Sequence, residues 1–310
     1  MRTTATTQTT STPDALTYHA TPGPFTDIRA HTARLRDLPE TLPDLCRVVQ
    51  GLVVHSFHAE LYGLDPKALR EEELQTRTAS AMLDRMVALD PRPLAEPRPP
   101  ERRFVGNCRH FTVLLTAFLR ARGVPARARC GFGAYFEPGG FVDHWVAEVW
   151  DPTRGAWRLI DAQIDPAHVK AHKIGFDPLD VPRSEFLVAG LAWQRCRRGE
   201  ADPQRFGIFD LRGSWFVLQN LVRDLAAHAK RELLPWDGWG LMLQKERYED
   251  PAVVELLDRV ADLTQAGDAD HLELMKLYES SPDLRLTRKI VSFGPGGGAT
   301  VDLGTGVTDD

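Results

Sequence analysis

Three residues in the middle of the chain have the types and the order that catalysis by a thiol nucleophile requires. Cys108 follows Gly106 and Asn107 and begins a long apolar stretch. A helix N-terminus or a neighbouring imidazolium stabilises a thiolate, and the free backbone N–H groups of such a terminus can also stabilise an oxyanion. A nucleophile of this kind needs a base, and the base needs an acceptor that orients it. His144 and Asp161 are the residues that we expect in these two roles.

A predicted β-hairpin brings the base and its acceptor to one face of a sheet. Residues 144–150 and 155–161 have strand-like sequences, and they flank Asp151-Pro152-Thr153-Arg154, which is typical of a type I turn. In the register set by a four-residue loop, His144 lies directly opposite Asp161. Opposed residues have Cβ atoms about 4.5–5.5 Å apart, within reach of an imidazole–carboxylate hydrogen bond. A slip of one residue would instead place Asp161 on the other face.

Other carboxylates and cysteines fit these roles less well. Asp143 precedes His144 directly, so the alternation of a strand turns it away, and Asp165 is the fallback acceptor. His110 follows Cys108 by two positions, which on a helix points it to a different side. The remaining thiols are interpreted as structural, because free cysteine is among the most buried residue types: Cys46, Cys130 and Cys196.

The elements around the nucleophile can be predicted from hydrophobic periodicity. The residues from Cys108 to Arg122 are apolar on nearly every side, a pattern typical of a buried helix, and Gly123 and Pro125 end it. From 126 to 134, apolar residues alternate with arginines and glycines, which predicts a strand. Helical patterns precede and follow this region, and a segment with five prolines between Asp90 and Arg103 separates the first of them from it.

Four motifs in this order resemble the transglutaminase-like superfamily. They are Gly-Asn-Cys at 106–108, Leu-Arg-Ala-Arg-Gly-Val-Pro-Ala-Arg at 119–127, Asp-His-Trp-Val-Ala-Glu-Val at 143–149, and Trp-Arg-Leu-Ile-Asp at 157–161. The resemblance covers about 102–166. It implies an α+β fold with a papain-like, transglutaminase-type core, in which a central helix with cysteine at its N-terminus packs on an antiparallel sheet, here with helical flanking segments. By this resemblance Cys108 is the nucleophile, His144 the general base and Asp161 the orienting acceptor.

The substrate-binding residues are less well defined than the three catalytic candidates. Papain-type proteases have an oxyanion-hole glutamine six residues before the nucleophile, but this chain has Arg102 there, so the second oxyanion donor is unassigned and Asn107 is a candidate. Arg127 and Arg129 share one strand face and are candidates for contact with a carboxylate or phosphate, and Trp145 is a further substrate candidate. No calcium loop or zinc-ligand spacing occurs, so we expect neither metal nor cofactor.

Composition places the chain among globular proteins and sets its expected organisation. It has 310 residues, is 43% hydrophobic and carries a net charge of −5, which argues against nucleic-acid binding. No apolar run is long enough to span a membrane, and no secretory h-region occurs. Because the cysteines are also expected to be unpaired, we expect a cytoplasmic protein. The expected segments are a disordered polar lead at 1–24, a helical segment at 25–98, the catalytic core at 99–168, a helical and aromatic segment packing on the core at 169–290, and a flexible glycine-rich tail at 291–310.

The expected activity is acyl transfer through a thioester on Cys108. The substrate would be an amide or ester within a peptide, protein or small molecule, and either water or an amine would resolve the acyl-enzyme, so hydrolysis and amide transfer both stay open. The alternative is an inactive transglutaminase-like scaffold that serves as a protein-binding module. That hypothesis expects Cys108 and His144 to lie apart, or Asp161 to point away from the imidazole.

Overall fold

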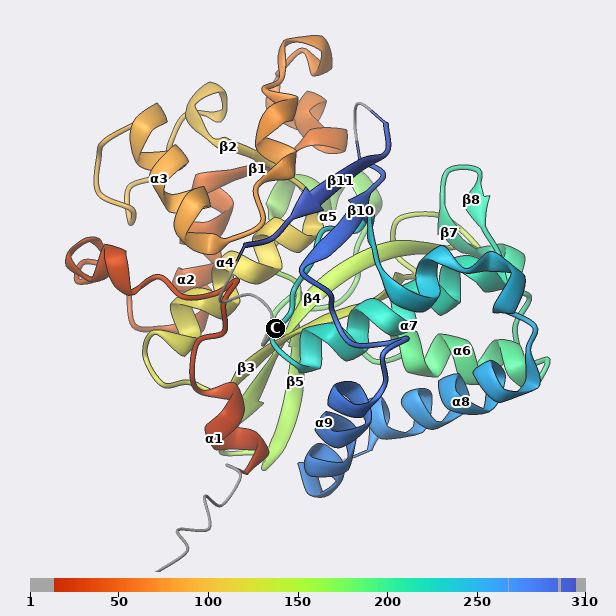
Figure 1. Cartoon of the computed structure of the whole chain (residues 1–310). Coiled ribbons are helices and arrows are strands. Elements are labelled where there is room, and N and C mark those ends of the chain that lie inside the picture. The colour runs from red at the N-terminus through yellow and green to blue at the C-terminus, as the bar shows by residue number, and fades with distance from the viewer. Residues whose placement is uncertain (1–13, 267, 295–296, 305–310) are drawn as a thin grey trace, which may run out of the picture.

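The computed structural model describes residues 14–266, 268–294 and 297–304. Helices and antiparallel strands are mixed in an α+β arrangement, with the long central strands lying between the N-terminal and the C-terminal helices (Figure 1). The helices are α1 Ala15–His19, α2 Leu42–Leu52, α3 Ala79–Leu89, α4 Cys108–Arg120, α5 Pro166–His172, α6 Ala189–Arg197, α7 Ser214–His228, α8 Pro251–Gln265 and α9 His271–Ser280.

Strands of the described residues form three sheets. The largest has the order β6-β3-β4-β7-β8, with β5 also paired to β4, and the smaller ones are β1-β2 and β11-β10-β9. The strands are β1 Val53–His55, β2 Phe104–Gly106, β3 Ala126–Gly133, β4 Phe141–Asp151, β5 Ala156–Ile160, β6 Phe186–Val188, β7 Phe206–Ile208, β8 Leu211–Arg212, β9 Asp237–Gly238, β10 Lys289–Ser292 and β11 Ala299–Asp302.

The central helix α4 is buried along its whole length, as its sequence predicts. It begins at Cys108 because Asn107 caps it: the Asn107 side chain accepts a hydrogen bond from the Arg109 N–H, and the His110 side chain accepts one from the Asn107 N–H. This reciprocal arrangement satisfies two of the backbone donors that a helix N-terminus leaves free. Every residue of α4 is buried, so the helix is fixed by packing on all sides.

The strand alternation of β3 and β4 separates an apolar face from a charged one. Small and apolar residues of the two strands, such as Ala126 and Val149, pair with each other and pack with α2, α3 and α4. On the opposite face Arg127 pairs with Glu148, and Arg129 lies opposite Val146. A second apolar core lies between the sheet and the helices α6, α7, α8 and α9. The sheet is therefore held between two groups of helices from opposite ends of the chain.

The β4–β5 hairpin forms, but its register differs from the expected one by two residues. Trp150 pairs with Trp157 and Ala147 pairs with Ile160, so Asp161 follows the strand at the level of Val146 instead of opposite His144. The loop lies one residue later on the β4 side than predicted, because Asp151 itself pairs, with Ala156. A shift of two residues preserves the face of each side chain. His144 and Asp161 therefore still share a face and approach each other diagonally.

Two expectations about the termini are wrong over their described parts. In the lead expected to be disordered, α1 is capped by Asp14, and His19 is fully buried against aromatic neighbours. In the tail expected to be flexible, β10 and β11 pair with each other, β10 also pairs with β9, and this cross-strand hydrogen bonding orders both strands although the tail is rich in glycine. Residues 1–13, 295–296 and 305–310 lie outside the described residues, so those parts of both expectations stay predictions.

One pairing crosses the proline-rich boundary expected near residue 98. Strand β1, from the N-terminal helical segment, runs parallel to β2, which leads directly into α4. His55 lies opposite Gly106 in this pair. Strands β6, β7 and β8 likewise come from the segment expected to be only helical and aromatic, and they extend the core sheet. Over the described ranges, none of the helices is both long and apolar enough to cross a bilayer.

Acid should destabilise the fold through its buried imidazoles. Burial lowers the pKa of His19 and of His228 well below the ordinary value, so both stay neutral in the folded chain. The unfolded imidazoles protonate near pH 6.5, so below that pH the unfolded chain binds protons that the folded chain does not, and stability falls with pH. Replacing His228 by leucine removes one such group, so the loss of unfolding free energy between pH 7 and pH 5 should be about 2 kcal/mol smaller than in the unmodified chain.

Urea unfolding at the two pH values measures this difference. The pKa of His144 is shifted in the opposite direction, and it acts equally in both chains, so it cancels from the comparison. His228 has neither ring nitrogen bonded to a described residue, so the substitution breaks no hydrogen bond. Equal pH dependence of the two chains would contradict the prediction.

Candidate active site

The nucleophile candidate Cys108 occupies the first position of α4 and is buried. Its side chain lies in a buried cluster with Cys130 and Trp145, yet the residue is 7% exposed. The first backbone donors of α4 are used by Asn107, whose side chain binds the Arg109 N–H. The Cys108 N–H itself donates to no acceptor among the described residues. This amide is free to bind a developing negative charge at the sulfur or on a substrate oxygen.

The imidazole of His144 is held by a buried carboxylate. His144 Nε2 lies 2.8 Å from Asp161 Oδ2, and the side chains are 3% and 1% exposed. Asp161 also accepts hydrogen bonds from the Tyr135 hydroxyl at 2.6 Å and from the Gln163 N–H at 3.1 Å. Three donors thus fix the carboxylate, and the carboxylate fixes the ring.

The charges of this pair stabilise each other despite their burial. Burial alone would lower the pKa of His144, but the charge and hydrogen bond of Asp161, followed by those of Cys108, outweigh it and raise the pKa to about 10. Burial alone would raise the pKa of Asp161, but the His144 charge and the hydrogen bonds from His144, Tyr135 and Gln163 hold it below its ordinary value. The imidazole is therefore protonated and the carboxylate ionised near neutral pH.

The same arrangement leaves one nitrogen of the ring without a described partner. Asp161 binds Nε2, so Nδ1 stays without a described partner, and a hydrogen bond to the Cys108 side chain is among the causes of the raised His144 pKa. His144 therefore interacts with Asp161 through a hydrogen bond and with Cys108 through an influence on its pKa. This arrangement can hold a proton between sulfur and imidazole and fix the tautomer of the base.

Two further residues expected at the site lie beside Cys108 but are closed to solvent. Asn107 caps α4 through its Oδ1 atom, and its Nδ2 atom has no acceptor among the described residues. Trp145 packs in the same cluster as Cys108 and is 1% exposed, and its Nε1 atom also has no described acceptor. Both donors are sealed inside the protein, so neither touches a substrate in this conformation.

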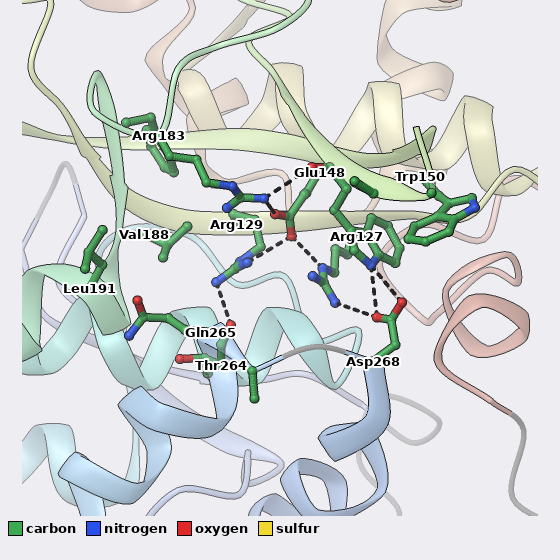
Figure 2. A pocket seen from close by; sticks show the side chains of 15 residues that line it. Arg127, Arg129, Glu148, Trp150, Arg183, Val188, Leu191, Thr264, Gln265 and Asp268 are labelled. Carbon is green, nitrogen blue, oxygen red and sulfur yellow. Dashed lines mark hydrogen bonds and ion pairs between the residues drawn. The ribbon is translucent and has the colours of Figure 1, made fainter. Parts of the chain in front are cut away.

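Arg127 and Arg129 line a separate cavity of about 540 Å³ (Figure 2). Both guanidinium groups bind Glu148, at 2.7 and 2.9 Å, and Arg129 also binds Asp224 at 2.8 Å. Arg183 adds a third ion pair to Glu148. The two arginines expected to contact substrate therefore have protein carboxylates as partners, and neither Cys108 nor His144 lines this cavity.

The alternative acceptors are engaged elsewhere, which the alternation of the strand predicts for Asp143, whereas Asp165 was the fallback acceptor. Asp143 is buried, binds the Asn220 side chain at 2.7 Å, and has its pKa raised by burial. Asp165 caps α5 and binds the ring of His168 and the hydroxyl of Tyr62. Neither carboxylate bonds to His144.

Sequence reasoning did not identify the residues that surround the three candidates. Tyr135 lies in the loop after β3, where no periodicity indicates the direction of a side chain. The Gln163 N–H bond is an aspartate turn, in which the side chain binds the backbone two residues on, a pattern that Asp161 alone could have suggested. Aromatic rings also lie near His144. The Phe136 ring lies 4.8 Å from the His144 ring and contacts that of His58, which stacks on His55.

The family comparison agrees with this geometry. Residues 74–162 match the model of the transglutaminase-like superfamily, so this part of the chain is similar to that superfamily. The matched segment contains Cys108, His144 and Asp161. Comparison with curated proteins gives no match.

One solved structure, a candidate cysteine protease from Cytophaga hutchinsonii, is similar over 51% of this chain and 45% of its own, with 15% identity and a TM-score of 0.29. The present chain therefore spans less than half of that protein, and a likeness of this size carries no argument about function.

Within the described ranges, no group of three or more histidine, cysteine or acidic side chains is arranged to hold a metal ion.

Glu148 should be a structural anchor of the charged sheet face. It is 1% exposed and binds three guanidinium groups, so Glu148→Gln leaves buried cations without their shared partner. Breaking a buried ion pair on one side costs about 3–5 kcal/mol, and we expect a loss of that size in the unfolding free energy from urea titration. The control is Glu137→Gln, which breaks an exposed pair with Arg212 and should cost less than about 1 kcal/mol. Similar losses in both variants would contradict a structural role for Glu148.

Proposed function

We propose that the chain is a thiol enzyme that transfers acyl groups through a thioester on Cys108. The observation that carries the proposal is the 2.8 Å hydrogen bond between Asp161 Oδ2 and His144 Nε2, beside a Cys108 side chain that contributes to the raised pKa of His144. Nucleophile, base and orienting acceptor are the three groups that this chemistry needs. They come from α4, β4 and the segment after β5, and all three lie within the part of the chain that matches the transglutaminase-like superfamily.

In the proposed reaction, the His144 imidazolium already holds the proton of Cys108, and the thiolate sulfur attacks the carbonyl carbon of an amide or ester. The electron pair of the carbonyl moves to oxygen and then returns, which breaks the bond to the leaving amine or alcohol. The His144 imidazolium gives its proton to that leaving group. Water or an amine then attacks the thioester, with His144 as general base, and the thiol is restored. Water gives hydrolysis, and an amine gives a new amide.

The alternative of an inactive scaffold has less support. A binding module has no use for a carboxylate, an imidazole and a thiol in line, and it expects Asp161 to point away from the ring. Asp161 instead points toward the His144 ring and binds it, and this orientation together with the raised pKa of His144 favours the enzyme hypothesis. We therefore propose a peptide, protein or small-molecule amide or ester as the substrate.

Iodoacetamide should modify Cys108 before the other cysteines at neutral pH. Burial raises the pKa of Cys46 to about 12, that of Cys196 to about 11, and that of Cys130 well above its ordinary value, so these three remain thiols. The thiolate is the reactive form. We expect Cys108 to react at least about tenfold faster than Cys196, measured by mass spectrometry of the labelled peptides. The Cys196→Ser variant should keep this fast reaction and Cys108→Ala should lose it. Equal labelling of Cys108 and Cys196 would exclude an activated thiol.

Removing the Asp161 charge should lower the pKa of His144. The Asp161 charge and hydrogen bond are the main causes that raise it, so Asp161→Asn leaves burial as the main influence. NMR titration of the His144 ring in Cys108→Ala should give a midpoint well above pH 6.5, and the added Asp161→Asn change should move it below that value. With the thiol present, Asp161→Asn should also slow alkylation at pH 7, because fewer His144 rings are protonated. Asp143→Asn, which removes a carboxylate not bonded to the ring, is the control. An unchanged midpoint in the Asp161 variant would contradict the proposed role.

A further inference from the structure

The tetrahedral intermediate of the proposed reaction carries an oxyanion, and the site described above supplies one unpaired donor for it. That donor is the Cys108 N–H, which has no acceptor among the described residues. Asn107 Nδ2 and Trp145 Nε1 lack acceptors too, but both atoms are sealed from solvent. A second donor must be open to the site, and its hydrogen must be in place before the charge develops.

His55 lies beside the start of the nucleophile helix, although it is 53 positions earlier in the chain. It ends β1, which runs parallel to β2, and it lies opposite Gly106, two residues before Cys108. Strand β1 also contacts α4 itself. The backbone pairing therefore holds the imidazole at the N-terminal end of α4, where the free Cys108 N–H is located.

The hydrogen bonding of His55 fixes its tautomer. Nδ1 accepts a hydrogen bond from the Phe57 N–H at 3.1 Å, and a neutral ring that accepts at Nδ1 carries its hydrogen on Nε2. Nε2 bonds to no described residue, and it is not among the sealed polar atoms. Burial holds the pKa of His55 well below its ordinary value, so the ring is a neutral donor at neutral pH. The result is an N–H group with a fixed position and no acceptor of its own.

Ring contacts connect His55 to the general base across the site. Its ring stacks on that of His58, with centroids 4.7 Å apart and an angle of 25°. The His58 ring lies 6.1 Å from Phe136, and Phe136 lies 4.8 Å from His144. The charge of His144 also acts on His55, which places both imidazoles in one electrostatic neighbourhood. Stacking limits rotation of the His55 ring, so its N–H direction is preorganised.

We propose that His55 is the second oxyanion donor of the Cys108 site. Its Nε2–H and the Cys108 N–H bind the carbonyl oxygen of an amide, ester or thioester when the sulfur attacks the carbonyl carbon. The electron pair that moves to this oxygen is stabilised by the two hydrogen bonds and returns when the leaving group departs with a proton from His144. His55 keeps its own proton throughout. This inference rests on the acyl-transfer function proposed above.

Two thiol reagents separate the role of His55 from that of Cys108. Iodoacetamide alkylates sulfur without an oxyanion, whereas p-nitrophenyl acetate acylates it through a tetrahedral oxyanion. The ratio of the acylation rate to the alkylation rate at Cys108, measured for each variant by mass spectrometry, therefore reports oxyanion stabilisation alone. Loss of one oxyanion-hole donor costs about 10²–10³ in rate, so His55→Phe should lower the ratio about 100-fold. His55→Gln, whose amide N–H replaces Nε2–H, should recover about tenfold of that loss. The matched control, His58→Phe, changes the stacked neighbour and should leave the ratio within about threefold.

The outcomes distinguish the two proposals. An unchanged ratio in His55→Phe, or a ratio that falls equally in His58→Phe, overturns the role of His55 and leaves the thiol chemistry standing. An unmodified chain that alkylates rapidly at Cys108 but is not acylated there also overturns it. If Cys108 is alkylated no faster than Cys196, the proposed thiol-enzyme function itself is overturned. If His55→Phe does not fold, His55→Met, which fills the space without an N–H, serves for the same comparison with His55→Gln.

Discussion

The site depends on a buried carboxylate that must stay ionised. Asp161 is 1% exposed, and an isolated charge at that depth would be neutralised. It stays charged because donors reach it from three segments: Tyr135 after β3, His144 on β4 and the Gln163 N–H after β5. The Asp161 N–H in turn donates to the Pro178 carbonyl, which fixes the backbone. The order of β3, β4 and β5 in the sheet is therefore what makes the charge pair possible.

The elements that carry local patterns were predictable. The apolar sequence after Cys108 gave a buried helix with the expected start, and the alternation after residue 126 gave a strand with its arginines on one face. The hairpin register was less secure, because turn propensity at Asp151 does not decide whether that residue belongs to the loop or to the ladder. The error left His144 and Asp161 on one face only because its size was even.

The features that depend on distant contacts were not predictable. Arg127 and Arg129 have the composition of a ligand-binding face, and only the fold reveals that Glu148 and Asp224 neutralise them. The same reason applies to Tyr135 and His55, which belong to the site through side-chain direction and strand pairing instead of spacing. The glycine-rich end was misjudged because composition reports the flexibility of an isolated segment, whereas β10 obtains its order from β9 and β11.

Because β1 and β2 pair in parallel, the residues proposed for the site come from two separate parts of the chain. A parallel pair needs a long crossover, and here residues 56–103 supply it. His55 consequently lies outside residues 74–162, the part that matches the superfamily, while the thiol, the imidazole and the carboxylate all lie inside it. Proteins that share this core can thus keep the same three groups and still differ in the strand that borders the nucleophile. Variation in β1 would alter how strongly a substrate carbonyl is polarised without changing the three groups that carry out the attack on it.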